Sequence, residues 1–430
     1  MRYLFWKMHV ARRLLALVLG LCALLAPRPA EAEPGDSLTV SLLTMGPGEH
    51  PFTKFGHSAI WIHDARDKRD LVFNFGTFAF DSPSLVLDSI EGKLPYWLSV
   101  GSMAQALASY GEQHRSLLAS ELRLTPAERF ALLEALNDNA RPEHRYYRYD
   151  YYRDNCATRV RDALDRALGG RLHARGATPA QMSYRAHTRR LVADEPELYV
   201  ALDLAVGRRA DAPITFWDEG FLPERLHDLV ARTTVVEGAR ELPLVKRERW
   251  FLSAGLVPTR AAPPRWFWFY LGVGLGLGSA LALLGARAES ARPRFALGVA
   301  SVALGVPLGL LGSALSYLTF FSAHSAAGSN YNVLLLPPWI LALPLAALAA
   351  RFARAWAAPL ARLAAIATLS STLLALAFHL LQHDPQQNGQ VLAFALPLWC
   401  GVTVAALCSK GQGAARRAGL EPARAAATPG

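Results

Sequence analysis

The stretch of sequence that most constrains the fold is residues 146–170, which read YYRYDYYRDNCATRVRDALDRALGG. From Cys156 onward the apolar residues recur at helical spacing, and the Gly pair at 169–170 marks the end of the predicted helix. Asp154 or Asn155 is a suitable N-cap for it. The pattern therefore predicts a helix with Cys156 in its first turn.

This position predicts a reactive thiol. The N-terminus of a helix carries partial positive charge, which lowers the pKa of a nearby thiol when the site is partly open. A thiolate is a nucleophile suited to covalent catalysis. The alternative is that Cys156 is an inert buried residue. Cys22, Cys400 and Cys408 lie in apolar segments, so Cys156 is the single cysteine of the polar half of the chain.

A catalytic cysteine needs a base, and His57 is the best-placed histidine. It begins a predicted strand at 57–62 directly after Gly56, and a second strand at 71–75 completes a hairpin. Asn74 lies among apolar residues of that second strand, where it is suited to orienting the imidazole ring. The alternatives are a core histidine and an ordinary polar strand residue.

Other segments of the polar half predict a mixed fold. A strand is predicted at 38–44, and helices are predicted at 102–109 and 125–138. No Cys, His or carboxylate pair accompanies Cys156 at metal-ligand spacing, and no Gly-rich phosphate loop is present. We therefore expect an α+β domain that uses no metal or other cofactor.

The N-terminus has the pattern of a secretory signal. A basic region is followed by an apolar core at 14–25 and by Ala30-Glu31-Ala32, which resembles a cleavage site. The apolar core is short for a membrane-spanning helix of ~20 residues, although a retained anchor is the alternative. We expect a signal peptide at 1–32 and an exported domain at 33–264.

The second half of the chain predicts a membrane domain at 265–409. Five apolar runs are long enough to cross a bilayer, at roughly 266–286, 295–320, 333–350, 357–380 and 391–408. Lys and Arg cluster in alternate connections, whereas loops 321–332 and 381–390 contain none. The positive-inside rule then places the basic connections, and a disordered tail at 410–430, in the cytoplasm.

The formal net charge of +10 is explained by this topology. Much of the excess lies in the N-terminal region, the membrane connections and the tail, so no nucleic-acid partner is expected. The two loops without basic residues lie on the side of the exported domain. The first contains His324, Asn330 and Asn332, which we expect to meet lipid headgroups or the thiol. The second is equally compatible with an ordinary solvated loop.

Several motifs together resemble a known family. The order of Phe-Gly-His57 on a strand and Asp-Asn-Cys156 on a helix resembles circularly permuted NlpC-type papain-like domains. More closely, the chain is similar to the Lnb-type lipoprotein N-acyltransferase family, which joins a periplasmic domain to five membrane helices. The similar segments are Leu43–Gly48, Phe55–Ala59, Val72–Phe78, Asp154–Arg159, Gly207–Asp211, Thr215–Pro223 and His324–Asn332.

This resemblance implies an acyltransferase of the bacterial inner membrane, with its catalytic domain in the periplasm. Cys156 would take a fatty acyl chain from a membrane phospholipid and pass it to the α-amine of a diacylated lipoprotein, with His57 as base. Asn155, Arg159, His324, Asn330 and Asn332 are the candidates for substrate binding. The alternatives are a membrane-anchored cysteine hydrolase of peptidoglycan stem peptides and a non-catalytic assembly factor.

Overall fold

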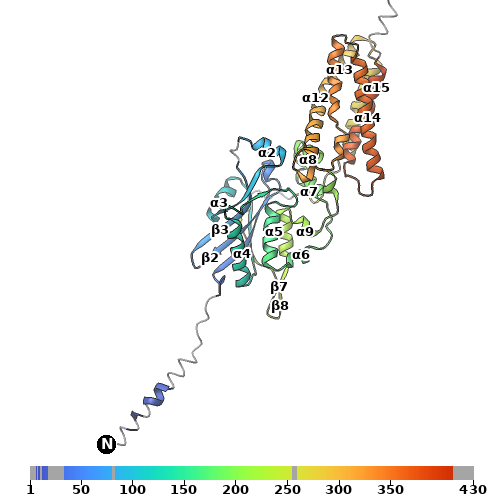
Figure 1. Cartoon of the computed structure of the whole chain (residues 1–430). Helices are drawn as coiled ribbons and strands as arrows, with labels where there is room; N and C mark the ends of the chain where they lie inside the picture. Colours follow the sequence, from blue (N-terminus) through green and yellow to red (C-terminus); the bar gives the residue numbers. More distant parts are fainter. Residues whose placement is uncertain are drawn as a thin grey trace, which may run out of the picture.

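The structure is a computed structural model that describes residues 33–79, 83–253 and 259–409, with residues 6, 8–9 and 12–17 of the N-terminal segment. Most of the predicted signal peptide at 1–32 and the whole predicted tail at 410–430 lie outside the described residues. In the described part, an α+β domain is followed by five helical segments apolar enough to cross a membrane (Figure 1). The predicted fold class is confirmed.

The described part of the soluble domain is built on a seven-stranded antiparallel sheet with strand order β6-β4-β3-β2-β1-β5-β9. The predicted hairpin is formed by β2 and β3, with Trp61 opposite Val72. A separate ribbon pairs β7 with β8. The strands are β1 (Leu38–Met45), β2 (His57–Asp64), β3 (Arg69–Thr77), β4 (Pro95–Gly101), β5 (Leu117–Leu122), β6 (Tyr146–Arg148), β7 (Thr234–Glu237), β8 (Arg240–Pro243) and β9 (Val245–Leu252).

The helices predicted at 102–109 and 125–138 of the soluble domain are confirmed. Each begins with a capping box, at Ser102 and at Thr125. The helical segments of the soluble domain are η1 (Pro51–Thr53), α2 (Leu85–Glu91), α3 (Met103–Glu112), α4 (Pro126–Asn139), α5 (Cys156–Ala167), α6 (Arg171–Gly176), α7 (Tyr184–Leu191), α8 (Pro196–Ala205), η2 (Arg208–Asp211), α9 (Phe216–Glu219) and α10 (Pro223–Ala231).

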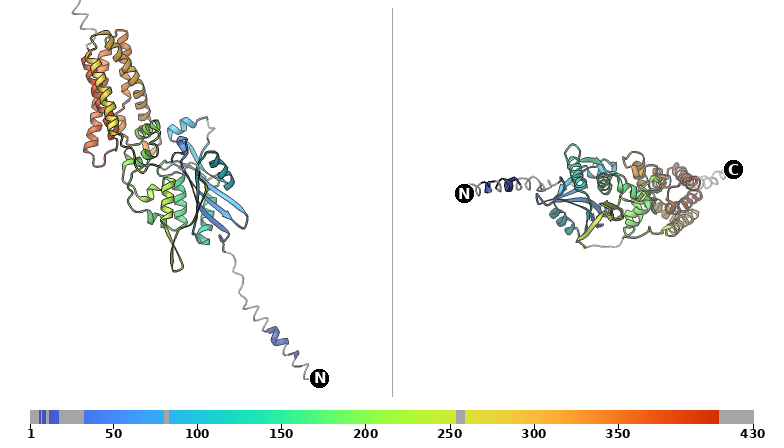
Figure 2. Two further views of the ribbon diagram at one scale, coloured as in Figure 1. Left: turned by 180° about the vertical axis from the view of Figure 1, so that it is seen from behind. Right: turned by 90° about the horizontal axis from the view of Figure 1, so that it is seen from below.

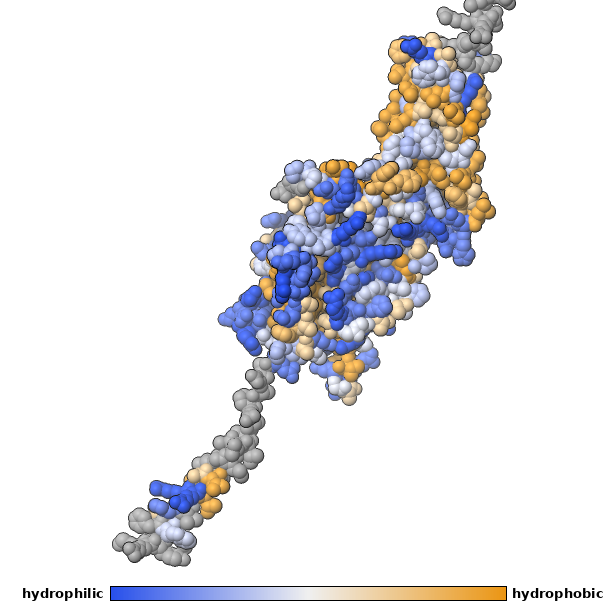
Figure 3. Space-filling model, in the orientation of Figure 1, coloured by the Kyte–Doolittle hydropathy of each residue, from blue (hydrophilic) through white to orange (hydrophobic). Residues whose placement is uncertain are grey.

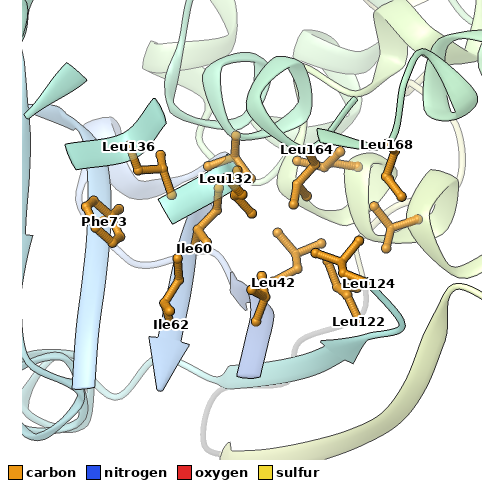
Figure 4. Close-up of a cluster of buried hydrophobic side chains, with 14 of the residues drawn as sticks. Leu42, Ile60, Ile62, Phe73, Leu122, Leu124, Leu132, Leu136, Leu164 and Leu168 are labelled. Atoms are coloured by element: carbon orange, nitrogen blue, oxygen red, sulfur yellow. The ribbon is translucent and has the colours of Figure 1, made fainter. Parts of the chain in front are cut away.

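Apolar side chains alternate between the two faces of the sheet, so the domain has two apolar layers, one on each face. One face of the sheet packs against α4 and α5, and Figure 4 shows Phe73 next to Leu136 and Ile60 next to Leu132, with Leu164 farther along the same layer. The opposite face packs against α3 through a second cluster that includes Leu43, Ala59 and Val72. This arrangement fixes the N-terminus of α5 against the beginning of β2 and the end of β3.

The membrane domain follows as a helix bundle whose outer surface is largely hydrophobic, whereas the soluble domain is mostly hydrophilic (Figure 3). Its regular helices agree with the predicted spans. They are α11 (Phe267–Ala286), α12 (Ala291–Phe320), α14 (Ala357–Leu381) and α15 (Gly389–Cys408).

The third span, Tyr331–Arg351, differs from the continuous helix predicted at 333–350. Only α13 (Ala342–Arg351) is α-helical, preceded by η3 (Ser325–Ala327), η4 (Tyr331–Leu334) and η5 (Pro338–Leu341). Adjacent prolines at 337–338 remove two N–H donors and interrupt the helix. Ser371 Oγ donates to the Leu334 carbonyl at 2.8 Å, and Trp399 Nε1 donates to the Leu335 carbonyl at 2.9 Å. The irregular backbone is thus satisfied inside the bundle.

The two domains are joined by buried polar contacts at the C-terminus of α8. Asn330 Nδ2 donates to the carbonyls of Leu204 and Ala205, at 2.7 and 3.1 Å. Asn332 Nδ2 donates to the carbonyls of Asp203 and Leu204, at 3.3 and 3.1 Å. Because the last carbonyls of a helix lack partners within it, these membrane-domain amides complete α8. Figures 1 and 2 show α7 and α8 between the sheet and the bundle.

Candidate active site

Cys156 is the first residue of α5, as predicted, and is 8% exposed. The N-cap is Asn155, whose side-chain oxygen accepts from the backbone N–H groups of Ala157 and Thr158, each at 2.9 Å. In return, the Thr158 hydroxyl accepts from the Asn155 backbone N–H at 2.7 Å. This capping box fixes the turn that carries the thiol.

The structure gives Asn155 a different position from the substrate-binding one predicted. Its side chain is buried, and its amide nitrogen donates to the backbone carbonyls of Tyr151 and Phe221, each at 2.9 Å. With the two bonds accepted by its oxygen, this amide makes all four of its hydrogen bonds within the protein. Asn155 is therefore a residue that positions Cys156 rather than one that faces a substrate.

The thiol side of α5 lies against a β-bulge in β3. Gly76 has φ of 86° within the register shift between Asn74 and Thr77. A Cβ atom built on Gly76 would lie 3.3 Å from the Cβ of Cys156, a close contact in a conformation that disfavours other residues. The bulge therefore lets α5 approach the sheet at Cys156.

His57 is the first residue of β2, directly after Gly56 with φ of 79°. Its Nε2 lies 3.4 Å from Oδ1 of Asn74, so the structure brings the two residues of the predicted pair together. Its ring stacks on Tyr110 of α3, with the centroids 6.4 Å apart. Burial, together with the charge of Arg115, lowers the pKa of His57 to about 4, although the Asn74 bond opposes this shift. The imidazole is therefore neutral at physiological pH.

The expectation of a lowered thiol pKa is not met. Burial raises the pKa of Cys156, and this effect exceeds the opposing influence of the backbone N–H groups of Ser58, Ala157 and Cys156 and of the Arg115 charge. The prediction from the helix N-terminus required a partly open site. The thiol of Cys156 and the imidazole of His57 are therefore both neutral in the ground state.

Arg115 is a functional candidate that sequence reasoning missed. It is 4% exposed and lies over the ring of Tyr110, with its guanidinium carbon 4.8 Å from the ring centroid. Its Nε donates to the Gly46 carbonyl at 2.9 Å and its Nη1 to the Gln113 side chain at 3.3 Å. Its Nη2 is buried without a hydrogen-bond partner among the described residues. A buried cation with an unused donor beside Cys156 and His57 is suited to stabilising negative charge.

Aromatic residues cover the thiol on the β4–β6 side. Tyr96 of β4 stacks on Tyr149 with ring centroids 4.3 Å apart, and Tyr147 of β6 lies beside both. Burial is the main cause that raises the pKa of all three tyrosines, and the nearby Cys156 contributes. The tyrosines therefore stay neutral and form a largely apolar cover. The Tyr-rich run at 146–152 was the available sequence signal.

Two further predicted binding residues, Arg159 and His324, lie in different parts of the molecule. Arg159 forms an ion pair with Asp154, and its guanidinium lies 4.1 Å from the ring centroid of Tyr147, near the thiol. His324 lies farther along the membrane-domain junction, where its Nε2 is 2.7 Å from the Ser89 carbonyl of α2.

Asn330 and Asn332 depart from the substrate-binding prediction. They are 2% and 0% exposed, and they hold α8 as described above. Gln386 and Asn388 of the second loop donate to their side-chain oxygens, at 3.0 and 2.9 Å. The ordinary solvated loop is therefore the wrong interpretation for this part of the second loop. Loop polarity identified the junction, but burial makes these amides structural.

The chemistry available at the site rests on a thiol, an imidazole, an amide and a guanidinium. In the described residues, no group of three or more His, Cys, Asp or Glu side chains is arranged to hold a metal ion. The thiol at a helix N-terminus, together with a neutral imidazole, is an arrangement suited to acyl transfer by nucleophilic catalysis.

Comparison with known families assigns both halves of the chain. Residues 28–194 match the Lnb N-terminal periplasmic domain, and residues 280–410 match the Lnb transmembrane domain. No curated protein and no solved structure matches the chain. The first match contains His57, Asn74, Arg115 and Cys156, and the second contains the loops at the junction. Together they indicate a membrane-associated periplasmic enzyme family and an inner-membrane location.

Proposed function

The chain belongs to the Lnb family, and on that premise we propose that it transfers a fatty acyl chain from a membrane phospholipid to the α-amine of a diacylglyceryl-cysteine. The observation that carries this proposal is the thiol of Cys156 at the capped N-terminus of α5, which meets the start of β2 at the backbone N–H of Ser58, the residue after His57 in the His57–Asn74 pair. The domain that holds it is joined by buried hydrogen bonds to a membrane bundle. Both substrates are held in the membrane, so a site fixed at the bilayer surface gains from proximity.

His57 is the proposed general base. With Nε2 donating to Asn74, the proton of the neutral ring is on Nε2 and Nδ1 is the basic nitrogen. Because the thiol is protonated in the ground state, Nδ1 takes its proton as sulfur attacks the ester carbonyl carbon. The ester C–O bond then breaks, and the lysophospholipid leaves with that proton, which leaves an acyl thioester on Cys156.

The second half-reaction uses the same groups. The α-amine of the diacylglyceryl-cysteine attacks the thioester carbonyl and gives up a proton to His57, while the C–S bond breaks and the sulfur takes the proton back. The backbone N–H groups of Cys156 and Ser58 face the sulfur and are our candidates for holding the oxyanion, with the Arg115 charge behind them. The products are an amide-linked triacylated lipoprotein and free enzyme.

The proposed topology follows from the same chemistry. The junction side of the bundle lies with the catalytic domain in the periplasm. The basic connections and the C-terminus then lie in the cytoplasm, in agreement with the positive-inside rule.

The test is complementation in a bacterium depleted of its own lipoprotein N-acyltransferase. We expect the wild-type protein to restore N-acylated lipoproteins, detected by mass spectrometry of their N-terminal peptides. Cys156→Ala should abolish this product at unchanged protein level, and Cys156→Ser should accumulate an acyl ester. Cys400→Ser, at an exposed cysteine in α15, is the matched control and should retain activity.

Absence of N-acylated product with the wild-type protein would refute the proposal. Cleavage of peptidoglycan stem peptides by the same protein would instead support the cysteine hydrolase. Full activity of the Cys156→Ala variant would refute both enzyme assignments.

A further inference from the structure

An apolar groove lies over the paired strands β4 and β6, on the side of the soluble domain next to the membrane bundle. Its volume is about 420 Å³, within the range of roughly 300–1,000 Å³ that is usual for small-molecule sites. The lining residues are Lys93, Leu94, Pro95, Tyr146, Tyr147 and Arg148. Because Pro95 pairs with Arg148 in antiparallel strands, Lys93 and Arg148 lie toward the same end of the groove, and the other lining residues are apolar or aromatic.

The groove adjoins the thiol site at β6, where Tyr146 and Arg148 lie on one face of the strand and the Tyr147 ring lies on the face toward Cys156. A Cβ atom built on Gly76 would lie 3.8 Å from the hydroxyl oxygen of Tyr147 and 3.3 Å from the Cβ of Cys156. The same tyrosine therefore lines the groove and lies beside the nucleophile. Its hydroxyl is buried on the thiol side of β6 without a hydrogen-bond partner among the described residues, so a donor is available there to the carbonyl of an ester that reaches Cys156.

The other end of the groove is continuous with the membrane domain. Arg148 donates to the Ala323 carbonyl at 3.2 Å, and the backbone N–H of Ala323 donates to the Glu91 carbonyl at 2.8 Å. Tyr317, near the end of the membrane-spanning α12, donates to the Glu91 carboxylate at 3.4 Å. Two residues after α2, the chain enters the groove at Lys93.

Helix α2 carries an exposed apolar face at this junction. Val86, Leu87 and Ile90 are 71%, 57% and 44% exposed. Figures 1 and 2 place α2 beside the soluble-domain end of the bundle, and Figure 3 shows a hydrophobic patch there. An exposed apolar face next to membrane-spanning helices is suited to insertion among lipid chains at the bilayer surface.

The charges at the groove distinguish between the two lipid substrates. Lys93 and Arg148 supply cations at its rim, although Lys93 also pairs with Glu91 at 2.7 Å. A phospholipid carries an anionic phosphate next to its acyl chains, whereas a diacylglyceryl-cysteine carries none. A cationic rim around an apolar groove is therefore complementary to the phospholipid.

We propose that this groove binds the donor phospholipid, which enters from the leaflet beside α2 with its phosphate at Lys93 and Arg148 and its scissile ester near Tyr147. This inference rests on the proposed acyl transfer, because it assigns the donor to one side of Cys156. The acceptor lipoprotein then approaches from another direction.

The test uses full-length Cys156→Ala protein in vesicles of phosphatidylethanolamine and phosphatidylglycerol that contain a phospholipid with a diazirine in its acyl chain. After irradiation, peptides are mapped by mass spectrometry. We expect labelling within residues 93–97 and 146–149, reduced at least fivefold by Pro95→Trp, which fills the groove at an exposed position, and by the double change Lys93→Glu with Arg148→Glu. The double change Arg66→Glu with Lys68→Glu, at exposed positions of the β2–β3 turn, is the charge-matched control and should label as the parent does.

Labelling confined to α11–α15, or labelling unaffected by Pro95→Trp, would overturn the inference. Complete displacement of the probe by a synthetic diacylglyceryl-cysteine peptide would assign the groove to the acceptor instead and would also overturn it. The two proposals fail separately. Groove labelling without N-acylation in cells would refute only the acyl transfer to lipoproteins, whereas full N-acylation by the Pro95→Trp variant would refute only the groove assignment.

Discussion

His57 gives the most direct prediction, because its half-buried position beside a cation ties the stability of the fold to pH. The pKa of His57 is lowered from 6.5 to about 4 in the folded protein. Between these values the unfolded chain binds a proton that the folded chain does not bind, so stability falls as pH falls. The contribution of His57 is complete above pH 6.5 and is lost progressively as pH decreases toward 4.

The size of the effect follows from linkage. A shift from 6.5 to about 4 corresponds to about 3 kcal/mol at the acid limit, at 1.36 kcal/mol for each pKa unit. At pH 5, where the unfolded histidine is almost fully protonated, the loss relative to pH 7 is about 2 kcal/mol. For a domain of this size, that corresponds to roughly 4–8 °C in Tm.

The assay compares thermal unfolding of the wild-type protein and His57→Gln in the same detergent at pH 7 and pH 5, followed by tryptophan fluorescence. Loss of the Asn74 hydrogen bond shifts the variant equally at both pH values, and the titrating carboxylates are common to both proteins. We therefore expect the Tm of the wild type to decrease by 4–8 °C more than that of the variant. Equal decreases would refute the assignment of a neutral His57 with a lowered pKa.

Further predictions concern the residues around the same site. Because burial raises the pKa of Cys156, we expect its alkylation by iodoacetamide to accelerate continuously from pH 6 to pH 9; a rate already constant below pH 7 would contradict the neutral pair. Asn155→Ala removes a cap and leaves buried carbonyls unpaired, so the free energy of unfolding should fall by roughly 2–4 kcal/mol in denaturant titrations, and a loss below 0.5 kcal/mol would contradict its structural role. Arg115→Gln removes a charge that lowers the pKa of His57, so the acid limb of the acylation rate should move to higher pH, whereas Arg115→Lys should keep the wild-type profile. Asn332→Leu unpairs carbonyls of α8, so transfer from membrane phospholipid should fall more than transfer from a short-chain soluble ester; equal losses would contradict a role in joining the domains.

Elements specified by neighbouring residues were predictable from the sequence. The α5 helix is defined by its cap, its apolar spacing and its terminal glycines, and the spans of the bundle by length and hydropathy. The pairing of His57 with Asn74 was also predictable, because the strands at 57–62 and 71–75 are close enough in sequence to form one hairpin. Alternation in a hairpin then determines which side chains share a face.

Features that depend on distant parts of the chain were not predictable in this way. Arg115 reaches the site because β5 pairs with β1, so that its guanidinium meets the carbonyl of Gly46. The pKa of Cys156 depends on how closely the aromatic residues and β3 cover it, which no local pattern records. The amides at 330 and 332 were visible as polar residues, but their partners on α8 lie more than 120 residues earlier.

Burial of the proposed nucleophile has a consequence for the kind of reaction that the site favours. A closed site makes the thiol a weaker nucleophile in the ground state, because it disfavours the thiolate. The same closure would keep water from the proposed thioester on Cys156, and exclusion of water protects reactive acyl intermediates from hydrolysis. A hydrolase requires an attacking water at that position, whereas a transferase requires its absence until the amine arrives. The cover formed by Tyr96, Tyr147 and Tyr149, although it costs nucleophilicity, is therefore better suited to acyl transfer than to hydrolysis.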